Sequence, residues 1–110
     1  MKSFLVIYHA PKEAVQQMSK ATYEEIVEAT KPWMEWKSNN DDIIENFGSR
    51  LSNGQEKSAN QNWTTSEKDV TGYSILKGES IEDIKNKLEF HPQLAWSPDC
   101  KVGIYEFSGM

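Results

Sequence analysis

The feature that most restricts the fold is the segment SFLVIY, residues 3–8. It is a continuous apolar run of β-branched and aromatic residues, and His9, Ala10 and Pro11 close it. Such a run is typical of a strand that is buried on both faces of its sheet. The segment CKVGIYEF, residues 100–107, has the same two-sided pattern apart from Lys101 and Glu106. Both strands therefore need a cover on each face of the sheet.

Residues 22–40 predict a long helix. Thr22 and Glu25 have the spacing of a capping box, which satisfies free N–H groups at a helix start. Pro32 falls inside the helix, where it removes one backbone hydrogen bond. A shorter helical turn is expected in residues 10–20. The apolar stripe that we expect to face the core consists of Tyr23, Ile26, Val27, Thr30, Trp33 and Met34.

A second amphipathic helix is predicted over residues 80–91. Ser80 is a natural N-cap residue, and Pro92 is expected to stop the helix because proline disfavours the helical conformation of the residue before it. The residue before it is His91, which we expect at the helix exit on the core-facing side. The core positions of this helix are Ile81, Ile84 and Leu88.

Two further segments complete an α+β fold. DVTGYSILKG, residues 69–78, predicts a strand. IIENFGSRLSNGQ begins as a strand from residue 43, Asn53–Gly54 is a turn signal, and KSANQNWTT is expected to pair back across that turn. The order β-α-β-β-α-β predicts one ferredoxin-like domain over residues 1–110, with two helices on one face of an antiparallel sheet. The simplest cover for the other face is a second copy of the chain, sheet against sheet.

The charge and the composition exclude several classes of protein. There are 17 acidic and 12 basic residues, giving a net charge of −5, and the basic residues are scattered, so we expect no nucleic-acid partner. The apolar run Phe4–Tyr8 is shorter than the ~7–15 residues of a signal-peptide core. We therefore expect no membrane association and a cytoplasmic location. Cys100 is the single cysteine, so no disulfide forms within the chain.

Three segments resemble the YCII-related proteins of the dimeric α+β barrel superfamily. They are MKSFLVIYHA at the start, TGYSILKGESIEDIKNKLEFHPQL in the middle and CKVGIYEFSGM at the end. The resemblance implies a homodimer with facing sheets, and some members are proposed to be enzymes with a histidine and an aspartate in a cleft. The family often has an acidic residue or a cysteine where this chain has His91. The DGPF sequence of one subgroup is absent, and SEKDVTGY stands in its place.

The first candidate for chemistry is His91. At a helix end its first explanation is a cap of free carbonyls. The alternative is a general acid/base in a cleft, since an unperturbed imidazole has a pKa of about 6.5. A base of this kind needs a carboxylate to orient it, and Asp99 is the nearest acidic residue towards the C-terminus after Pro92. We predict His91 and Asp99 as the catalytic pair.

The ligand-binding candidates are His9, Trp36 and Trp96. His9 ends the first strand, Trp36 lies at the edge of the apolar stripe, and Trp96 follows His91 in a loop. Cys100 is expected to be a small buried residue. The chain has two histidines and one cysteine and lacks metal-ligand spacing, so we predict no metal and no cofactor.

Three functions fit these residues. The first is a small dimeric enzyme that uses a histidine as general acid/base on a small molecule. The second is a non-catalytic module that binds a small ligand, and the third is a structural dimer. A pocket lined by His91 and a carboxylate favours the first, and a pocket lined only by aromatic residues favours the second.

Overall fold

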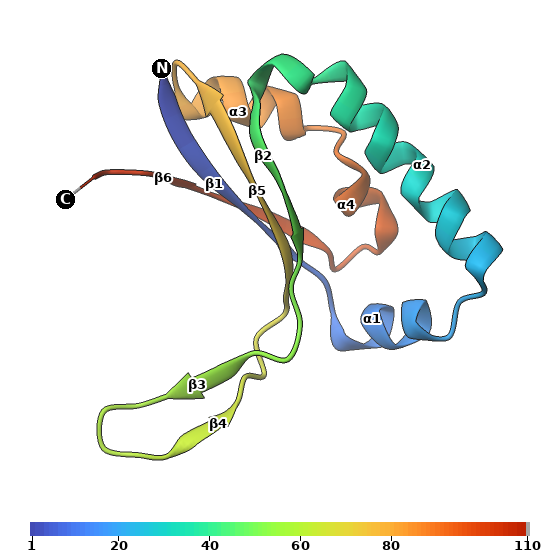
Figure 1. Ribbon diagram of the computed structural model, residues 1–110, viewed down its shortest axis with the longest axis vertical. Helices are drawn as coiled ribbons and strands as arrows, with labels where there is room; N and C mark the ends of the chain where they lie inside the picture. Colours follow the sequence, from blue (N-terminus) through green and yellow to red (C-terminus); the bar gives the residue numbers. More distant parts are fainter. Residues whose placement is uncertain (110) are drawn as a thin grey trace.

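The computed structural model describes residues 1–109, which form one mixed α+β unit around a four-stranded antiparallel sheet (Figure 1). The order of strands across the sheet is β2-β5-β1-β6, and every neighbouring pair is antiparallel. The strands are β1 (Lys2–His9), β2 (Ile44–Arg50), β5 (Val70–Gly78) and β6 (Lys101–Glu106). This agrees with the strands expected at 3–8, from 43, at 69–78 and at 100–107.

The helices lie on one side of this sheet (Figure 1). They are α1 (Lys12–Ser19), α2 (Tyr23–Asn39), α3 (Ile81–Leu88) and α4 (Pro92–Trp96), with a short 3-10 turn η1 (Asp41–Ile43) before β2. The α2 helix begins with the predicted capping box, because the Thr22 hydroxyl accepts from the Glu25 N–H and the Glu25 carboxylate accepts from the Thr22 N–H. Ser80 caps α3 with a single hydrogen bond, in which its hydroxyl accepts from the Asp83 N–H.

The core lies between the sheet and the helices. Alternate residues of β1 point into it, and the intervening residues point to the other face. Ile84 and Leu88 of α3 are buried as predicted, whereas Ile81 is exposed. The cluster of buried apolar residues consists of Phe4, Val6, Tyr8, Trp36, Leu76, Ile84 and Leu88.

The prediction for the apolar stripe of α2 was largely wrong. Tyr23 is 81% exposed, and Ile26, Val27 and Met34 are exposed as well. Only Trp33 of that stripe packs against the core, and the buried residue of the helix is Trp36. Trp36 is fixed by its indole N–H, which donates to the Lys87 carbonyl at 3.1 Å. The first half of α2 therefore runs beyond the sheet that was expected to cover its apolar side.

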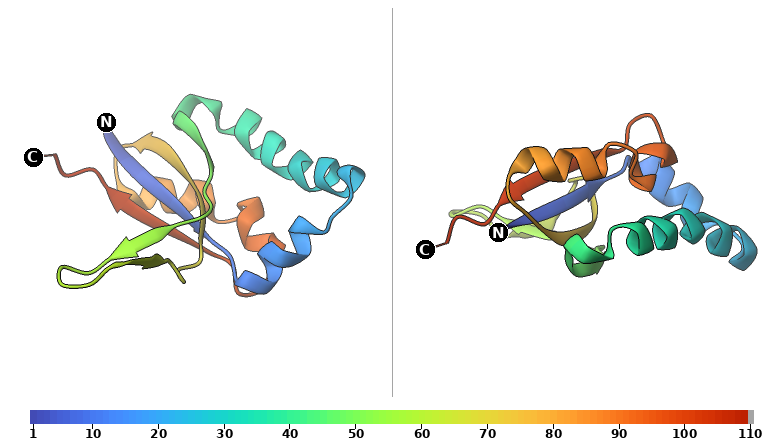
Figure 2. Two further views of the ribbon diagram at one scale, coloured as in Figure 1. Left: turned by 60° about the horizontal axis from the view of Figure 1, so that its bottom comes forward. Right: turned by 90° about the horizontal axis from the view of Figure 1, so that it is seen from above.

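Residues 55–65 form a separate two-stranded ribbon. Its strands are β3 (Gln55–Lys57) and β4 (Trp63–Thr65), which pair with each other and not with the large sheet. The turn of this hairpin spans residues 58–62, so pairing across Asn53–Gly54 was wrong. Asn53 instead has a φ of 57°, which bends the chain before the ribbon starts. The ribbon projects from the body on the side opposite the helices (Figure 1), and Figure 2 shows it from two further directions.

The second face of the sheet, which we call the open face, is covered by none of the helices within residues 1–109. Its apolar residues lie on neighbouring strands at paired positions: Leu5 is opposite Ile75 and Tyr105, and Ile7 is opposite Tyr73 and Gly103. None of these residues is fully buried. Of the two covers that the pattern of SFLVIY predicts, the structure shows the helices on one face, and nothing within residues 1–109 covers the other.

Candidate functional site

The site that the fold assembles lies where β1 ends and β5 begins. His9 is the last residue of β1, and Asp69 immediately precedes β5. Because these two strands are antiparallel neighbours, the end of the first lies beside the start of the second. The His9 Nδ1 atom is 2.7 Å from the Asp69 Oδ1 atom, so the two side chains form a hydrogen-bonded pair.

The geometry of the pair determines where a proton is held. A carboxylate only accepts hydrogen bonds, so Nδ1 carries the proton that binds Asp69. In the neutral imidazole, the lone pair is then on Nε2. The His9 side chain is 23% exposed, and its Nε2 lies 3.6 Å from the point that a Cβ on Gly103 would occupy, on the open face. The pair has the arrangement of a general base with its orienting carboxylate.

The backbone around His9 is held in place by several hydrogen bonds. The Ala10 N–H donates to the Asp69 carbonyl at 2.9 Å, and the Gln93 side-chain amide donates to the His9 carbonyl at 2.9 Å. Gln93 is itself buried at the start of α4. The main chain at His9 is thus tied to both β5 and α4, which fixes the origin of its side chain.

The second histidine, His91, lies on the helix side of the sheet in an aromatic cluster. Its ring stacks on Tyr8 with a centroid distance of 5.0 Å and meets the rings of Trp33 and Trp36 edge-on at 4.6 Å each. Tyr8 donates a hydrogen bond from its hydroxyl to Ser74, and Ser74 donates in turn to the Phe47 carbonyl. His91 is 1% exposed, so its inward direction was predicted correctly.

The hydrogen bonds of His91 make it a cap of the following helix. Its Nδ1 accepts from the Gln93 N–H at 3.0 Å, at the start of α4, while α3 has already ended at Leu88. Its Nε2 is buried with no hydrogen-bond partner among residues 1–109. Burial lowers the pKa of His91 to about 4, which favours the neutral ring. Tyr8 is affected in the opposite sense, since burial raises its pKa to about 12.

The predicted catalytic pair of His91 and Asp99 is not joined by a hydrogen bond or ion pair within residues 1–109. Asp99 is exposed, and its N–H binds the Ser97 hydroxyl. A general base needs a carboxylate beside it and access for a substrate. The imidazole of His91 is instead buried among aromatic rings. A catalytic role for His91 with Asp99 stays a prediction. The alternative, a cap of free carbonyls at the end of the preceding helix, was wrong in its partner, because the ring accepts from the Gln93 N–H at the start of α4.

The three predicted ligand-binding residues do not share one site. Trp36 is buried beside His91 on the helix side, while His9 points to the open face. Trp96 is the last residue of α4 and is partly buried. Cys100 is a buried free thiol, as expected, and burial raises its pKa.

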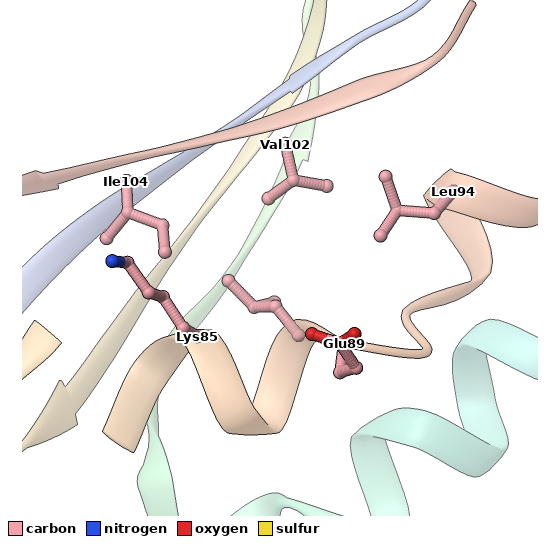
Figure 3. A pocket seen from close by; sticks show the side chains of 6 residues that line it. Lys85, Glu89, Leu94, Val102 and Ile104 are labelled. Atoms are coloured by element: carbon pink, nitrogen blue, oxygen red, sulfur yellow. The ribbon is translucent and has the colours of Figure 1, made fainter. Parts of the chain in front are cut away.

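A groove of about 300 Å³ lies on the helix side of the sheet, between α3, α4 and β6 (Figure 3). Neither histidine lines it, and no aromatic residue does. The side chains around it are Lys85, Leu88, Glu89, Leu94, Val102 and Ile104. The groove is therefore neither the pocket of histidine and carboxylate expected for an enzyme nor the aromatic pocket expected for a ligand-binding module.

Residues 1–109 meet neither the requirements of a metal site nor those of a membrane-spanning helix. No cluster of three or more histidine, cysteine, aspartate or glutamate side chains is arranged there to hold a metal ion. Within the same residues, no helix combines the length and the apolar character needed to cross a membrane.

Asp69 is the site residue that reasoning from the sequence missed. Its signal was the position at the start of the strand predicted at 69–78, together with the position of His9 at the end of the first strand. In a β-α-β-β-α-β fold the first and third strands are antiparallel neighbours, so the two side chains were due to meet. This pairing follows from the order of the strands in the sheet. Because His9 and Asp69 are 60 positions apart in the sequence, neither segment alone indicates that they meet.

The fold by itself defines a class: a mixed α+β protein with helices on one face of an antiparallel sheet. No protein-family model matches the sequence, and no curated protein matches it. A solved structure similar in fold is 5-chloro-2-hydroxyhydroquinone dehydrochlorinase (TftG) from Burkholderia phenoliruptrix AC1100, in complex with 2,5-dihydroxybenzoquinone. The TM-score is 0.53 at 11% identity, over 92% of this chain and 90% of that chain. The likeness concerns the fold alone.

Proposed function

We propose that this chain is a small homodimeric enzyme that transfers protons on a small molecule, with His9 as general acid/base and Asp69 as its orienting carboxylate. The observation that carries the proposal is the 2.7 Å pair, which leaves Nε2 of His9 available on the open face. His9 thereby takes the role that the sequence assigned to His91. The resemblance to YCII-related proteins supports this assignment, since a histidine and an aspartate in a cleft are implied there as well.

The second copy of the chain supplies the cleft. A single open face offers a base but little enclosure, and two such faces packed together shut out water around His9. The apolar residues of β1 and β5 on this face favour that cover. The fold likeness to a dimeric α+β barrel supports the same arrangement, with the ferredoxin-like sheets facing each other.

A planar acidic molecule is the natural first probe. The similar structure contains 2,5-dihydroxybenzoquinone, and its protein is a dehydrochlorinase of a hydroxyhydroquinone. Both compounds are small rings with ionisable hydroxyl groups, so a base on an apolar surface suits them. The ligand class is carried over from a neighbour at 11% identity and belongs to the proposal.

Exchange of the ring protons of 2,5-dihydroxybenzoquinone for deuterium tests the proposal directly. We expect the wild-type chain to accelerate loss of the ring-proton NMR signal in D₂O, and His9→Asn to reduce that acceleration by about 10²-fold or more, the usual contribution of a general base. Asp69→Ala should reduce it as well, because Nδ1 loses the acceptor that fixes the tautomer.

His91→Asn is the matched control, since it removes the other histidine and keeps a side-chain acceptor for the Gln93 N–H. The folded His91→Asn protein should retain the exchange activity. If His91→Asn abolishes the activity and His9→Asn does not, the catalytic histidine is His91 and the proposal for His9 fails. Binding of the quinone without any catalysed exchange would instead indicate a ligand-binding module.

A further inference from the structure

Gly103 lies in the interior of β6 although the backbone there does not require glycine. Its φ is outside the left-handed region, in contrast to Gly48 and Gly109. β6 also pairs with β1 in regular register from Phe4–Glu106 to His9–Lys101, without a bulge. Glycine weakens the interior of a strand, and the remaining common reason for it is that another group approaches the backbone closely.

The space above Gly103 is bordered by the candidate base. A Cβ atom at this position would lie 3.6 Å from His9 Nε2, 3.4 Å from Tyr105 Cε2 and 3.9 Å from the Tyr105 hydroxyl oxygen. One point on the open face is therefore within contact distance of the imidazole nitrogen and of the phenol. We call this space the Gly103 notch. Tyr105 is 60% exposed in the single chain.

The residues around the notch combine an apolar floor with groups that favour an anion. Ile7 is directly opposite Gly103 in the register, and Leu5 is opposite Tyr105, so both share its face. Lys101 is directly opposite His9 and is exposed on the same face. A flat apolar ring fits the floor, and a negative oxygen fits beside the lysine ammonium and the tyrosine O–H.

We propose that the Gly103 notch binds a small planar weak acid, of the phenol or enol type, with its ionisable oxygen between His9 Nε2 and the Tyr105 hydroxyl. This inference rests on the proposed function and names its ligand class and two further site residues. The ligand O–H bond breaks and its proton forms an N–H bond at Nε2. The electron pair stays on the ligand oxygen, where the Tyr105 O–H donates to it and Lys101 offsets its charge. Tyr105 is thus a ligand-binding residue, and Gly103 provides the room.

The test compares 4-nitrophenol with 4-nitroanisole, which has a methyl group in place of the acidic proton. Both are titrated into the ¹⁵N-labelled chain while amide shifts are followed. We expect shifts centred on residues 101–105 and His9, with 4-nitroanisole binding at least about tenfold more weakly, since a hydrogen bond to a charged group is lost. Absence of 4-nitrophenol binding, or equal binding of the two probes, would overturn the ligand class.

Gly103→Ala is the most informative variant. All three contacts of the added Cβ are at ordinary van der Waals distance or at its lower limit, and alanine is favoured over glycine in a strand, so the variant should melt no lower than wild type. It should nevertheless bind 4-nitrophenol about tenfold more weakly, because the methyl group fills the notch. Tyr105→Phe should weaken binding by a similar factor through loss of one donor. Lys77→Ala, on the open face opposite Ser3, is the control and should bind like wild type.

The variants separate this inference from the proposed function. If His9→Asn abolishes binding while Gly103→Ala and Tyr105→Phe bind like wild type, the notch is a packing space for the tyrosine ring and the inference is wrong, whereas His9 remains the candidate base. If His9→Asn also binds like wild type, the ligand lies elsewhere and both proposals lose their support.

Discussion

At the scale of the residue, His91 is a buried base held neutral by its surroundings. The rings of Tyr8, Trp33 and Trp36 surround the imidazole, and no carboxylate is paired with it within residues 1–109. Its Nδ1 accepts from the Gln93 N–H, so in the neutral ring Nε2 already carries the proton, and this N–H has no partner within residues 1–109. A second proton would have to enter at Nδ1, where it would displace the Gln93 N–H and create a buried, unpaired charge. The same desolvation lowers the pKa to about 4 from the ordinary value of 6.5.

The low pKa of His91 predicts that the protein loses stability in mild acid. The unfolded chain binds this proton near pH 6.5 and the folded chain near pH 4, so the stabilising contribution is complete above 6.5 and disappears as the pH falls to 4. The loss is on the order of 3 kcal/mol. Urea unfolding at a series of pH values measures it.

His91→Asn provides the comparison for this prediction. The variant keeps an acceptor for the Gln93 N–H but loses ring packing, so it should be about 1–3 kcal/mol less stable at pH 7. Between pH 6.5 and 4 its stability should change much less than that of the wild type. His9→Asn should keep the full acid sensitivity. Parallel pH profiles for wild type and His91→Asn would contradict a buried neutral imidazole.

At the scale of the element, the α2 helix extends beyond its packing partners. Its first half is exposed on every side, and the interactions that support it are local: the capping box and the ion pair between Lys31 and Glu28. Pro32 interrupts the hydrogen bonds of this same part of the helix. An isolated helical segment of this length is marginal in water, so the first half of α2 depends on its cap.

Replacing Pro32 with alanine should strengthen this half of α2 without much effect on the core. Alanine restores the missing N–H and improves helix propensity by about 3 kcal/mol, which corresponds to roughly hundredfold slower amide exchange. We expect the slowing at residues 26–32 in hydrogen-exchange mass spectrometry. Global unfolding should change far less, because this segment contributes little to the core. Ala29→Gly is the opposite control and should speed exchange in the same peptide.

The elements that were predicted correctly are those with local causes. Thr22 with Glu25 and Ser80 with Asp83 are caps within one turn, and the run SFLVIY needs only its own composition to predict a strand. The exposure of the apolar stripe of α2 could not be predicted. The spacing of apolar residues shows that a helix has an apolar side, but it does not show whether another element covers that side. The pairing of His9 with Asp69 is a consequence of strand order, and the pattern of each strand taken alone does not say which strand ends meet.

At the scale of the whole molecule, the open face is the side of the sheet that the helices within residues 1–109 leave uncovered. Its apolar residues belong to three adjacent strands, β5, β1 and β6, so they form a continuous surface. The two-stranded ribbon projects on this same side (Figure 1). A second copy placed on this face would contact the sheet and lie within reach of the ribbon.

Light scattering should therefore give twice the mass of one chain at micromolar concentration. Leu5→Lys, in the middle of the open face, should give a folded monomer, because a two-fold interface brings each substituted lysine into an apolar surface. Ile81→Lys, on the helix side, is the matched control and should remain a dimer. A wild-type chain that is monomeric at all these concentrations would remove the basis for an enclosed cleft.

The strand order has a consequence for how the chain acquires its structure. The ribbon turn at residues 58–62 divides the sequence into two halves, one containing β1 and β2 and the other β5 and β6. Across the sheet these halves alternate, β2-β5-β1-β6, so every hydrogen-bonded neighbour of a strand comes from the other half. The first half emerging from a ribosome has no partner with which to form the sheet, and its apolar strand β1 stays unpaired until β5 is made. The sheet thus cannot begin to form before β5 has been made, and contacts between distant parts of the sequence are expected to slow its folding.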